Sequence, residues 1–227
     1  MKSYQQYCSI ARSLDVVGDR WVLLIVRELL ALGPSRYSDL KRGLPGIATN
    51  LLADRLRAME AEGLIERYDA PPPVGTALFQ LTDRGRELQG VLHALAQWGL
   101  QRMTSGPRPE DAVQQQWVAL LGGLMLSERL APDTQLIVGI ETDAEAETMH
   151  VTLRPSGFEV RRGRAAAADV TLTGPAQLVG ALLSGLLTPD DATRHGLRIT
   201  GARQSLHDLV TASPGDAPGP TPGEATS

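Results

Sequence analysis

Residues 49–68 read TNLLADRLRAMEAEGLIERY, and this stretch decides the fold of the first half of the chain. Apolar residues recur in it at the helical spacing i, i+4 and i+7, at Leu52, Leu56 and Met59. We therefore expect a helix over residues 49–62 with one buried face. Gly63 is well placed to end it, because glycine readily adopts the left-handed conformation that follows many helices. The opposite face is open to solvent and carries Asn50, Ala53, Asp54 and Arg57.

Helical periodicity continues upstream of this stretch. One apolar stripe is formed by Ile10, Leu14 and Val17. An apolar run over residues 21–30 follows and ends at Gly33-Pro34, which predicts a second helix. A short third helix fits residues 37–42, and residues 43–46 (Gly-Leu-Pro-Gly) are typical of a turn. A short helix, a turn and a helix with a polar outer face predict a helix-turn-helix motif, whose second helix enters the major groove of DNA.

Two further elements complete the first domain. Residues 64–68 and 76–81 flank a proline-rich stretch and predict a two-stranded hairpin. Residues 82–85 then open a long helix, whose apolar stripe is Leu88, Val91, Leu92, Leu95, Trp98 and Met103. Helices, a hairpin and a final helix in this order predict a winged helix-turn-helix domain over residues 1–104.

The first half resembles the HxlR family of winged helix regulators over roughly residues 7–104. Several short motifs carry the resemblance together: Cys8, Gly18-Asp19-Arg20-Trp21, Leu24-Ile25-Val26-Arg27-Glu28-Leu29, Tyr37-Ser38-Asp39-Leu40, Pro45-Gly46-Ile47, Leu52 to Leu56, Glu62-Gly63-Leu64-Ile65 and Leu81-Thr82. The resemblance implies a transcription regulator that binds a double-stranded DNA operator as a homodimer joined through its first and fifth helices. The chain departs from the family pattern at Ser9, where proline is usual, and in the wing at Gly75-Thr76-Ala77.

The candidate DNA contacts gather on two helices and the hairpin. Asn50 and Arg57 lie on the polar face of the predicted recognition helix and suit hydrogen bonds to base edges, although such residues also serve as a solvated surface. The start of the preceding helix offers charge, hydroxyl and backbone N–H groups to phosphates. The full candidate set is Arg36, Tyr37, Ser38, Thr49, Asn50, Ala53, Arg55, Arg57 and Thr76.

Cys8 is the single cysteine of the chain, which excludes an intrachain disulfide. Two interpretations of it stay open. In one, it packs as a small apolar side chain near the dimer interface. In the other, it is a redox sensor, because some HxlR-like regulators respond to electrophiles through the matching cysteine, and a helix N-terminus or Arg12 would favour its thiolate.

Motif content argues against an enzyme or a membrane protein. Nucleophile-elbow, P-loop and dinucleotide-binding glycine motifs are missing, and His195 beside Asp190 and Asp191 is typical of a solvent-exposed helix cap. One thiol and four scattered histidines offer no zinc-ligand spacing, so no metal or cofactor is expected. No apolar run approaches the roughly 18 to 20 residues that span a bilayer, and no signal-peptide core follows Met1. We expect a cytoplasmic, non-enzymatic protein without a membrane partner.

Charge and composition divide the chain. Residues 1–104 carry 13 Lys and Arg against 11 Asp and Glu, whereas the rest carries 9 against 15, so DNA binding must come from a local cluster in the first half. A break rich in Gly and Pro predicts a linker at 105–110 and a second domain at 111–212. Residues 213–227 are dominated by Pro, Gly, Ala, Thr and Ser and predict a disordered tail.

The second half has an α+β pattern. A helix over residues 112–130 precedes four strands that alternate apolar and polar residues, and a helix over residues 176–187 is apolar nearly all round. With residues 196–201 and a last helix, this order resembles the SCP2 sterol-carrier fold over roughly residues 111–211. The resemblance implies a mixed or antiparallel sheet with helices and a tunnel for fatty or sterol-like molecules.

An apolar small molecule is therefore a candidate partner. The candidate pocket is Leu136, Val138, Ile140, Met149, Val151, Leu178, Leu182, Leu183 and Leu186. A filled core produces the same apolar pattern, and dimerisation is a third use for the domain. A lipid carrier whose winged helix serves protein contacts is the alternative to a regulator.

Overall fold

The computed structural model describes residues 3–73, 75–143 and 148–212. The chain divides into two compact units, Met1–Leu120 and Leu121–Ser227. The predicted disordered tail at 213–227 lies outside the described residues. Among the helices of the described ranges, none has the length and apolar character needed to cross a membrane.

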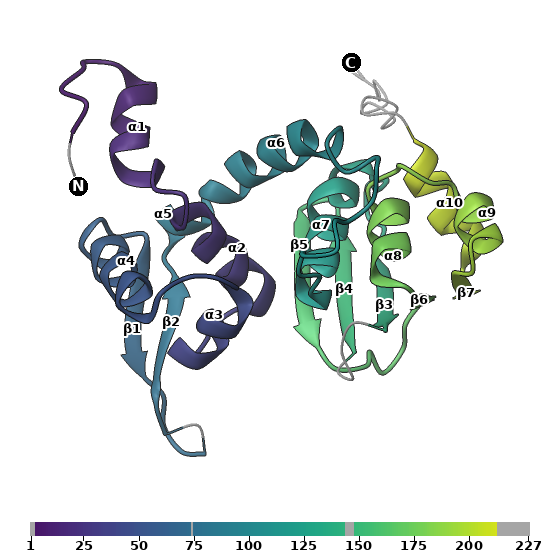
Figure 1. Cartoon of the computed structure of the whole chain (residues 1–227). Helices are drawn as coiled ribbons and strands as arrows, with labels where there is room; N and C mark the ends of the chain where they lie inside the picture. Colours follow the sequence, from purple (N-terminus) through teal and green to yellow (C-terminus); the bar gives the residue numbers. More distant parts are fainter. Residues whose placement is uncertain (1–2, 74, 144–147, 213–227) are drawn as a thin grey trace, which may run out of the picture. The chain divides into compact units, whose positions relative to one another are not determined.

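The first unit is a winged helix-turn-helix (Figure 1). Its elements are α1 (Ser9–Val17), α2 (Val22–Leu32), α3 (Tyr37–Gly43), α4 (Thr49–Ala61), β1 (Ile65–Asp69), β2 (Ala77–Leu81), α5 (Asp83–Arg86) and α6 (Leu88–Leu100). This order confirms the predicted helices and hairpin. Gly63 has φ +68°, so the predicted left-handed glycine does follow the recognition helix α4.

Helix α2 is the centre of the first unit, since it packs against α3, α6 and β2. Its apolar side chains join those of α3, α4 and the hairpin in one core: Val22, Ile25, Val26, Leu29, Leu40, Leu44, Leu52, Leu56, Met59, Ile65 and Leu81. Trp21 also belongs to this core, with 9% of its surface exposed. The central position of α2 follows from its composition, because a helix that is apolar on most sides must be covered on most sides.

The hairpin is tied to the entrance of α3. Strands β1 and β2 are antiparallel, from the pair Ile65 and Leu81 to the pair Asp69 and Ala77. On the other edge of β2, Phe79 exchanges two backbone hydrogen bonds with Ser35, each 2.9 Å long from N to O. Ser35 directly precedes the N-cap of α3, so the wing and the helix-turn-helix share a backbone connection.

The predicted single helix after the wing is wrong in one respect, because Glu87 separates α5 from α6. The short helix α5 is held against the residues that directly precede β1. The Thr82 hydroxyl donates to the Gly63 carbonyl over 2.6 Å and accepts from the Gly85 N–H over 3.1 Å. A Cβ at position 85 would lie 2.0 Å from the Leu64 carbonyl oxygen, so glycine allows this close approach.

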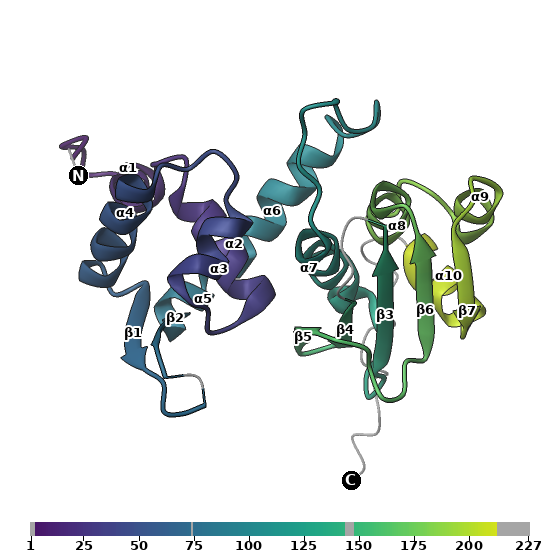
Figure 2. The ribbon, with the colours of Figure 1, turned by 60° about the horizontal axis from the view of Figure 1, so that its bottom comes forward.

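The second unit is a five-stranded mixed sheet with helices (Figure 2). Its strands are β3 (Leu136–Thr142), β4 (Met149–Arg154), β5 (Gly157–Arg162), β6 (Val170–Gly174) and β7 (Arg198–Gly201), in the order β5-β4-β3-β6-β7. Strands β3 and β6 are parallel, and the other neighbours are antiparallel. The helices are α7 (Gln115–Leu126, which begins before Leu121), the 3-10 turn η1 (Ser127–Arg129), α8 (Ala176–Leu183), α9 (Pro189–Arg194) and α10 (Arg203–Thr211).

One face of this sheet is apolar and covered. Four valines, one each from β5, β4, β3 and β6, lie in register across it: Val160, Val151, Val138 and Val170. Helix α8 packs on β3 and β6. The backbone of α7 lies close to β5, since a Cβ at Gly123 would be 2.3 Å from the Phe158 ring. The α+β class predicted for this half is confirmed.

Two helices of the second half are shorter than predicted. The helix expected over residues 112–130 is α7 from Gln115 to Leu126, followed by the 3-10 turn. The helix expected over residues 176–187 ends at Leu183. Gly185 then adopts φ +79°, a left-handed conformation that stops the helix before Leu186.

Candidate nucleic-acid interface

Two hydrogen bonds connect α3 to the turn and to the start of α4. The Tyr37 hydroxyl, at the start of α3, donates to the Thr49 carbonyl at the start of α4 over 2.7 Å. The Lys41 ammonium donates to the Ile47 carbonyl inside the turn. These bonds fix the N-terminus of α4, which is the end that a recognition helix presents to base edges.

Helix α4 buries one face and exposes the other, as its sequence predicts. Leu52, Leu56 and Met59 are at most 2% exposed. On the other side, Thr49, Asn50, Asp54 and Arg57 are exposed, and Ala53 is half-buried. Arg57 pairs with Asp54, whose Oδ1 lies 2.5 Å from Nη2, on the open surface. An exposed pair of this kind contributes little to stability, so Arg57 can exchange Asp54 for another acceptor.

Arg55 occupies a different environment from Arg57. Its Nη2 lies 2.9 Å from Oδ2 of Asp19, in the loop before α2, and 24% of its side chain is exposed. Arg55 therefore connects α4 to the body of the unit. Arg55 is one of the predicted DNA contacts, but the sequence did not indicate its ion pair with Asp19, which lies in the turn after the first helix.

The start of α3 presents exposed groups. Arg36 is the N-cap residue and Ser38 is exposed, while the Asp39 carboxylate accepts a long 3.4 Å hydrogen bond from the Arg36 N–H. Tyr37 is half-buried, and its O–H hydrogen is already donated to Thr49. A phosphate can only accept hydrogen bonds, so this hydroxyl reaches phosphate only by giving up the bond to Thr49.

Thr76 lies in the loop between the two strands of the wing, directly before β2. It is half-buried, and its carbonyl accepts from the Ala70 N–H over 3.0 Å. Arg67 and Tyr68, on β1, are exposed on the same hairpin, and sequence reasoning did not select them. An arginine followed by a tyrosine in the first strand of the predicted wing is the signal that would have found them, because both side chains can bond to phosphate.

Exposed apolar side chains gather on α1 and α6 and next to them. Within the described residues, the large apolar side chains exposed there are Tyr7, Ile10, Leu14, Val91, Leu95, Trp98 and Met103. Ile10 is 70% exposed and Trp98 68%. They belong to the apolar stripes predicted for the first and last helices of the domain. Val17, Leu88 and Leu92 of these stripes pack against the core, and the side chains given above stay exposed.

Cys8 is exposed and occupies the N-cap position of α1. Backbone N–H groups of Ala11 and Ile10 lower the pKa of its thiol below the ordinary value. The thiol is thus accessible in the single chain.

The second unit holds the candidate pocket residues in one layer. Leu136, Val138, Ile140, Met149, Val151, Leu182 and Leu183 are buried between the sheet and its helices. Leu178 is half-buried, and Leu186 is 41% exposed because it lies beyond the end of α8. The first seven form the layer, and Leu186 stands apart from it.

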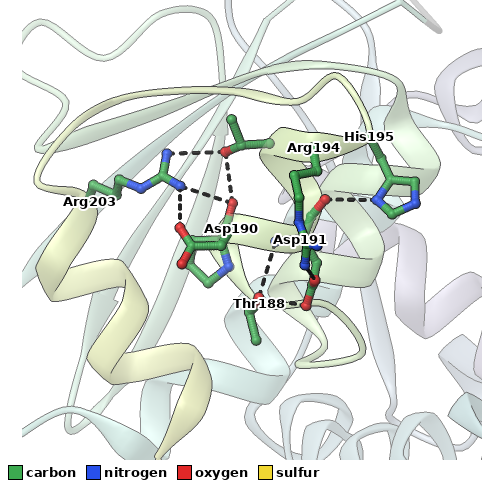
Figure 3. A network of polar contacts seen from close by, with 8 residues as sticks. Thr188, Asp190, Asp191, Arg194, His195 and Arg203 are labelled. Atoms are coloured by element: carbon green, nitrogen blue, oxygen red, sulfur yellow. Dashed lines mark hydrogen bonds and ion pairs between the residues drawn. The ribbon is translucent and has the colours of Figure 1, made fainter.

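His195 is part of a polar network that joins α9 to α10 (Figure 3). The Thr188 hydroxyl caps α9 by accepting from the Asp191 N–H, and it also lowers the pKa of the Asp191 carboxyl. His195 Nδ1 donates to the Asp191 backbone carbonyl over 2.8 Å, and Arg203 bonds to Asp190 over 2.7 Å. The histidine therefore bonds to a carbonyl rather than a carboxylate, which is a capping arrangement and not a catalytic pair.

The first unit is similar in sequence to known transcriptional regulators. The HxlR-like helix-turn-helix family matches residues 16–106. The HTH-type transcriptional regulator YtcD of Bacillus subtilis is 36% identical over 101 residues, which cover 44% of this chain and 78% of YtcD. The regulator YvaP of the same organism is 33% identical over 87 residues, covering 38% of this chain and 80% of YvaP.

Solved structures also match over less than half of this chain. The reduced form of the transcriptional regulator YodB from B. subtilis is 29% identical and covers 45% of this chain and 100% of YodB, with a TM-score of 0.39. The sequence identities to YtcD and YvaP, over more than three quarters of each, decide the assignment. The chain belongs to the HxlR-like helix-turn-helix family.

Proposed function

We propose that this protein is a non-enzymatic transcription regulator that binds operator DNA through α4. The observation that carries the proposal is the polar face of α4, where Asn50 and Arg57 are exposed opposite buried Leu52 and Leu56. Helix-turn-helix proteins use this face to read base edges in the major groove. Membership of a family whose named relatives are transcriptional regulators supports the same function.

Each candidate residue has a role in this proposal. Asn50 and Arg57 read bases, while Thr49 and Ala53 line the same face. Arg36, Ser38 and Thr76 contact the phosphate backbone and fix the register of the complex. Tyr37 and Arg55 position α4 through Thr49 and Asp19, so their contribution to DNA binding is indirect.

A homodimer is the proposed binding form. The exposed apolar side chains of α1 and α6 are more than a soluble monomer usually leaves in contact with water, and a second copy of the chain would cover them. Two recognition helices would then read half-sites about one helical turn apart, roughly 10 base pairs.

The second unit is proposed to bind the small molecule that regulates DNA binding. Its element order, α7, η1, β3 to β6, α8, α9, β7 and α10, supports an SCP2-like fold. The proposed ligand is an apolar molecule held between the sheet face of Val138 and Val151 and helix α8 at Leu182. Such a ligand changes DNA binding only as far as its affinity differs between the DNA-competent and incompetent states.

The test begins with selection of duplexes from a random-sequence library by the full wild-type chain. Binding of the selected duplex should weaken as salt rises, because phosphate contacts release counterions. Asn50→Ala and Arg57→Ala should each cost about 1–3 kcal/mol of specific binding free energy and leave the unfolding free energy unchanged. Arg161→Ala, an exposed arginine of β5, is the charge-matched control. If no duplex is bound even at low salt, the carrier alternative replaces the regulator.

A further inference from the structure

Glu28 is a carboxylate buried inside the first unit, with 0% of its surface exposed. It lies on α2, and its neighbour Arg27 donates to it, with Nε 2.9 Å and Nη2 2.7 Å from Oε1. Burial raises the pKa of Glu28, while the Arg27 charge opposes that shift. A carboxylate in this position is tolerated only while several donors surround it.

Two of those donors come from a segment outside the matched family region. Trp117 Nε1 donates to Oε1 of Glu28 over 2.6 Å, and Gln116 Nε2 donates to Oε2 over 3.3 Å. The Arg27 guanidinium carbon also lies 4.1 Å from the centroid of the Trp117 ring, in a cation–π contact. We call residues 114–117 the clasp. The family match ends at residue 106, so the clasp lies beyond the matched region.

The clasp also reaches the end of α3. Gln114 Nε2 donates to the Arg42 carbonyl over 3.0 Å, and Arg27 Nη2 donates to the Gly43 carbonyl over 3.2 Å. These are the last carbonyls of α3, which have no partner within the helix. The turn to α4 begins immediately after them, so the clasp and its ion pair hold the place where the helix-turn-helix changes direction.

We propose that the clasp is a regulatory contact that positions α3 and the turn for DNA binding. The proposal rests on the proposed function for its effect on DNA. With the clasp seated, the carboxylate of Glu28 has donors on both oxygens and α3 is capped. With the clasp displaced, Glu28 keeps only Arg27 among these donors, and the Arg42 carbonyl loses its partner. Because residues 115–117 of the clasp are also the first residues of α7, an event that moves the start of α7 acts directly on this contact.

The first arm of the test measures backbone hydrogen exchange in the full chain without DNA. Gln114→Ala removes the bond to α3, and Trp117→Phe removes the indole N–H but keeps a ring over Arg27. Both should raise the exchange rate of residues 40–48 about tenfold, and Trp117→Ala should raise it further. Glu110→Gln, an exposed carboxylate in the preceding loop, is the control and should change nothing.

The second arm measures affinity for the duplex that the wild-type chain selects. Trp117→Phe should lower this affinity about tenfold and lower affinity for unrelated DNA much less, because a displaced turn misplaces base contacts before phosphate contacts. Combining Trp117→Phe with Glu28→Gln should cost less than the sum of the two single variants, since both alter the same set of hydrogen bonds around Glu28.

The two arms separate this inference from the proposed function. Unchanged exchange at residues 40–48 in both Gln114→Ala and Trp117→Phe overturns the clasp. Faster exchange with unchanged duplex affinity overturns its regulatory role. If the wild-type chain selects no duplex, the proposed function fails, and the exchange measurement still decides whether the clasp holds α3.

Discussion

The backbone of Gly43 packs so closely against Glu28 that a Cβ at position 43 would lie 2.1 Å from Oε2. The buried carboxylate and the last residue of α3 therefore share a space that only glycine leaves open. The separation between α2 and the end of α3 is set by this contact and by the 3.2 Å bond from Arg27 to the Gly43 carbonyl.

Gly43→Ala should lower the unfolding free energy by about 1–3 kcal/mol, because the added methyl group forces α3 away from a buried ion pair. Urea unfolding of the full chain measures this. Gly90→Ala in α6 is the matched control, since a Cβ there meets no neighbour within 4 Å, and alanine should stabilise that helix by about 0.5–1 kcal/mol. Equal effects of the two substitutions would contradict the contact.

Glu28 should give a measurable pH dependence of stability. Burial raises its pKa in the folded state, so the folded chain binds this proton more readily than the unfolded chain. The contribution is fully present below the unfolded pKa of about 4.3 and is lost as pH rises through the higher folded value. The unfolding free energy of the wild type minus that of Glu28→Gln should therefore fall as pH rises above about 4. A difference that rises with pH would contradict a raised pKa of Glu28 in the folded state.

Tyr37→Phe tests whether the hydroxyl positions α4. Loss of the bond to the Thr49 carbonyl should reduce the unfolding free energy by about 0.5–1.5 kcal/mol in the absence of DNA. A hydroxyl reserved for phosphate would leave the stability of the free protein unchanged. Chemical denaturation of wild type and variant distinguishes these two roles.

Cys8 should behave as an acidic thiol. Its pKa is lowered by the backbone N–H groups of Ala11 and Ile10, so alkylation by iodoacetamide should show a midpoint below that of a free cysteine peptide. If the thiol is a sensor, a quinone or diamide should change duplex binding in the wild type and have no effect in Cys8→Ser. The same response in both proteins would return Cys8 to a packing role.

If the proposed ligand site exists, a bound apolar compound should stabilise the protein, and a larger side chain inside the site should prevent that stabilisation. A bound fatty acid, sterol or aromatic compound should stabilise the wild type by about 2.7 kcal/mol at one hundred times its dissociation constant. Leu182→Trp should abolish that stabilisation. If no compound raises the melting temperature and Leu182→Trp costs about 1–3 kcal/mol, the layer is a filled core.

Periodicity was enough to predict most of the fold. The spacing of Leu52, Leu56 and Met59 gave the buried face of α4, and Gly63 gave its end, because both depend on local backbone geometry. The alternating strands of the second half followed in the same way. The end of α8 at Leu183 was missed because the apolar pattern continues past the left-handed Gly185 that stops the helix. The break at Glu87 was missed because α5 is held by contacts with the residues before β1, which no local pattern shows.

The candidate site was less predictable than the fold. Exposure of Asn50 and Arg57 followed from their helical positions. The partners of Arg55, Tyr37 and Glu28 did not, because each lies far along the chain or across a turn. Trp117 is 89 residues from Glu28, and no local pattern indicates that its indole N–H completes a buried ion pair.

The two hydrogen bonds between Ser35 and Phe79 have a consequence for the shape of DNA that the protein accepts. They connect the wing rigidly to the entrance of α3, so in the proposed complex the distance from the major groove to the flanking backbone contacts is fixed. A flexible wing could change its conformation to fit each DNA sequence, whereas a rigidly held wing requires the DNA to change its own shape. Duplexes whose flanking steps bend or narrow easily should therefore be preferred at positions that no side chain touches.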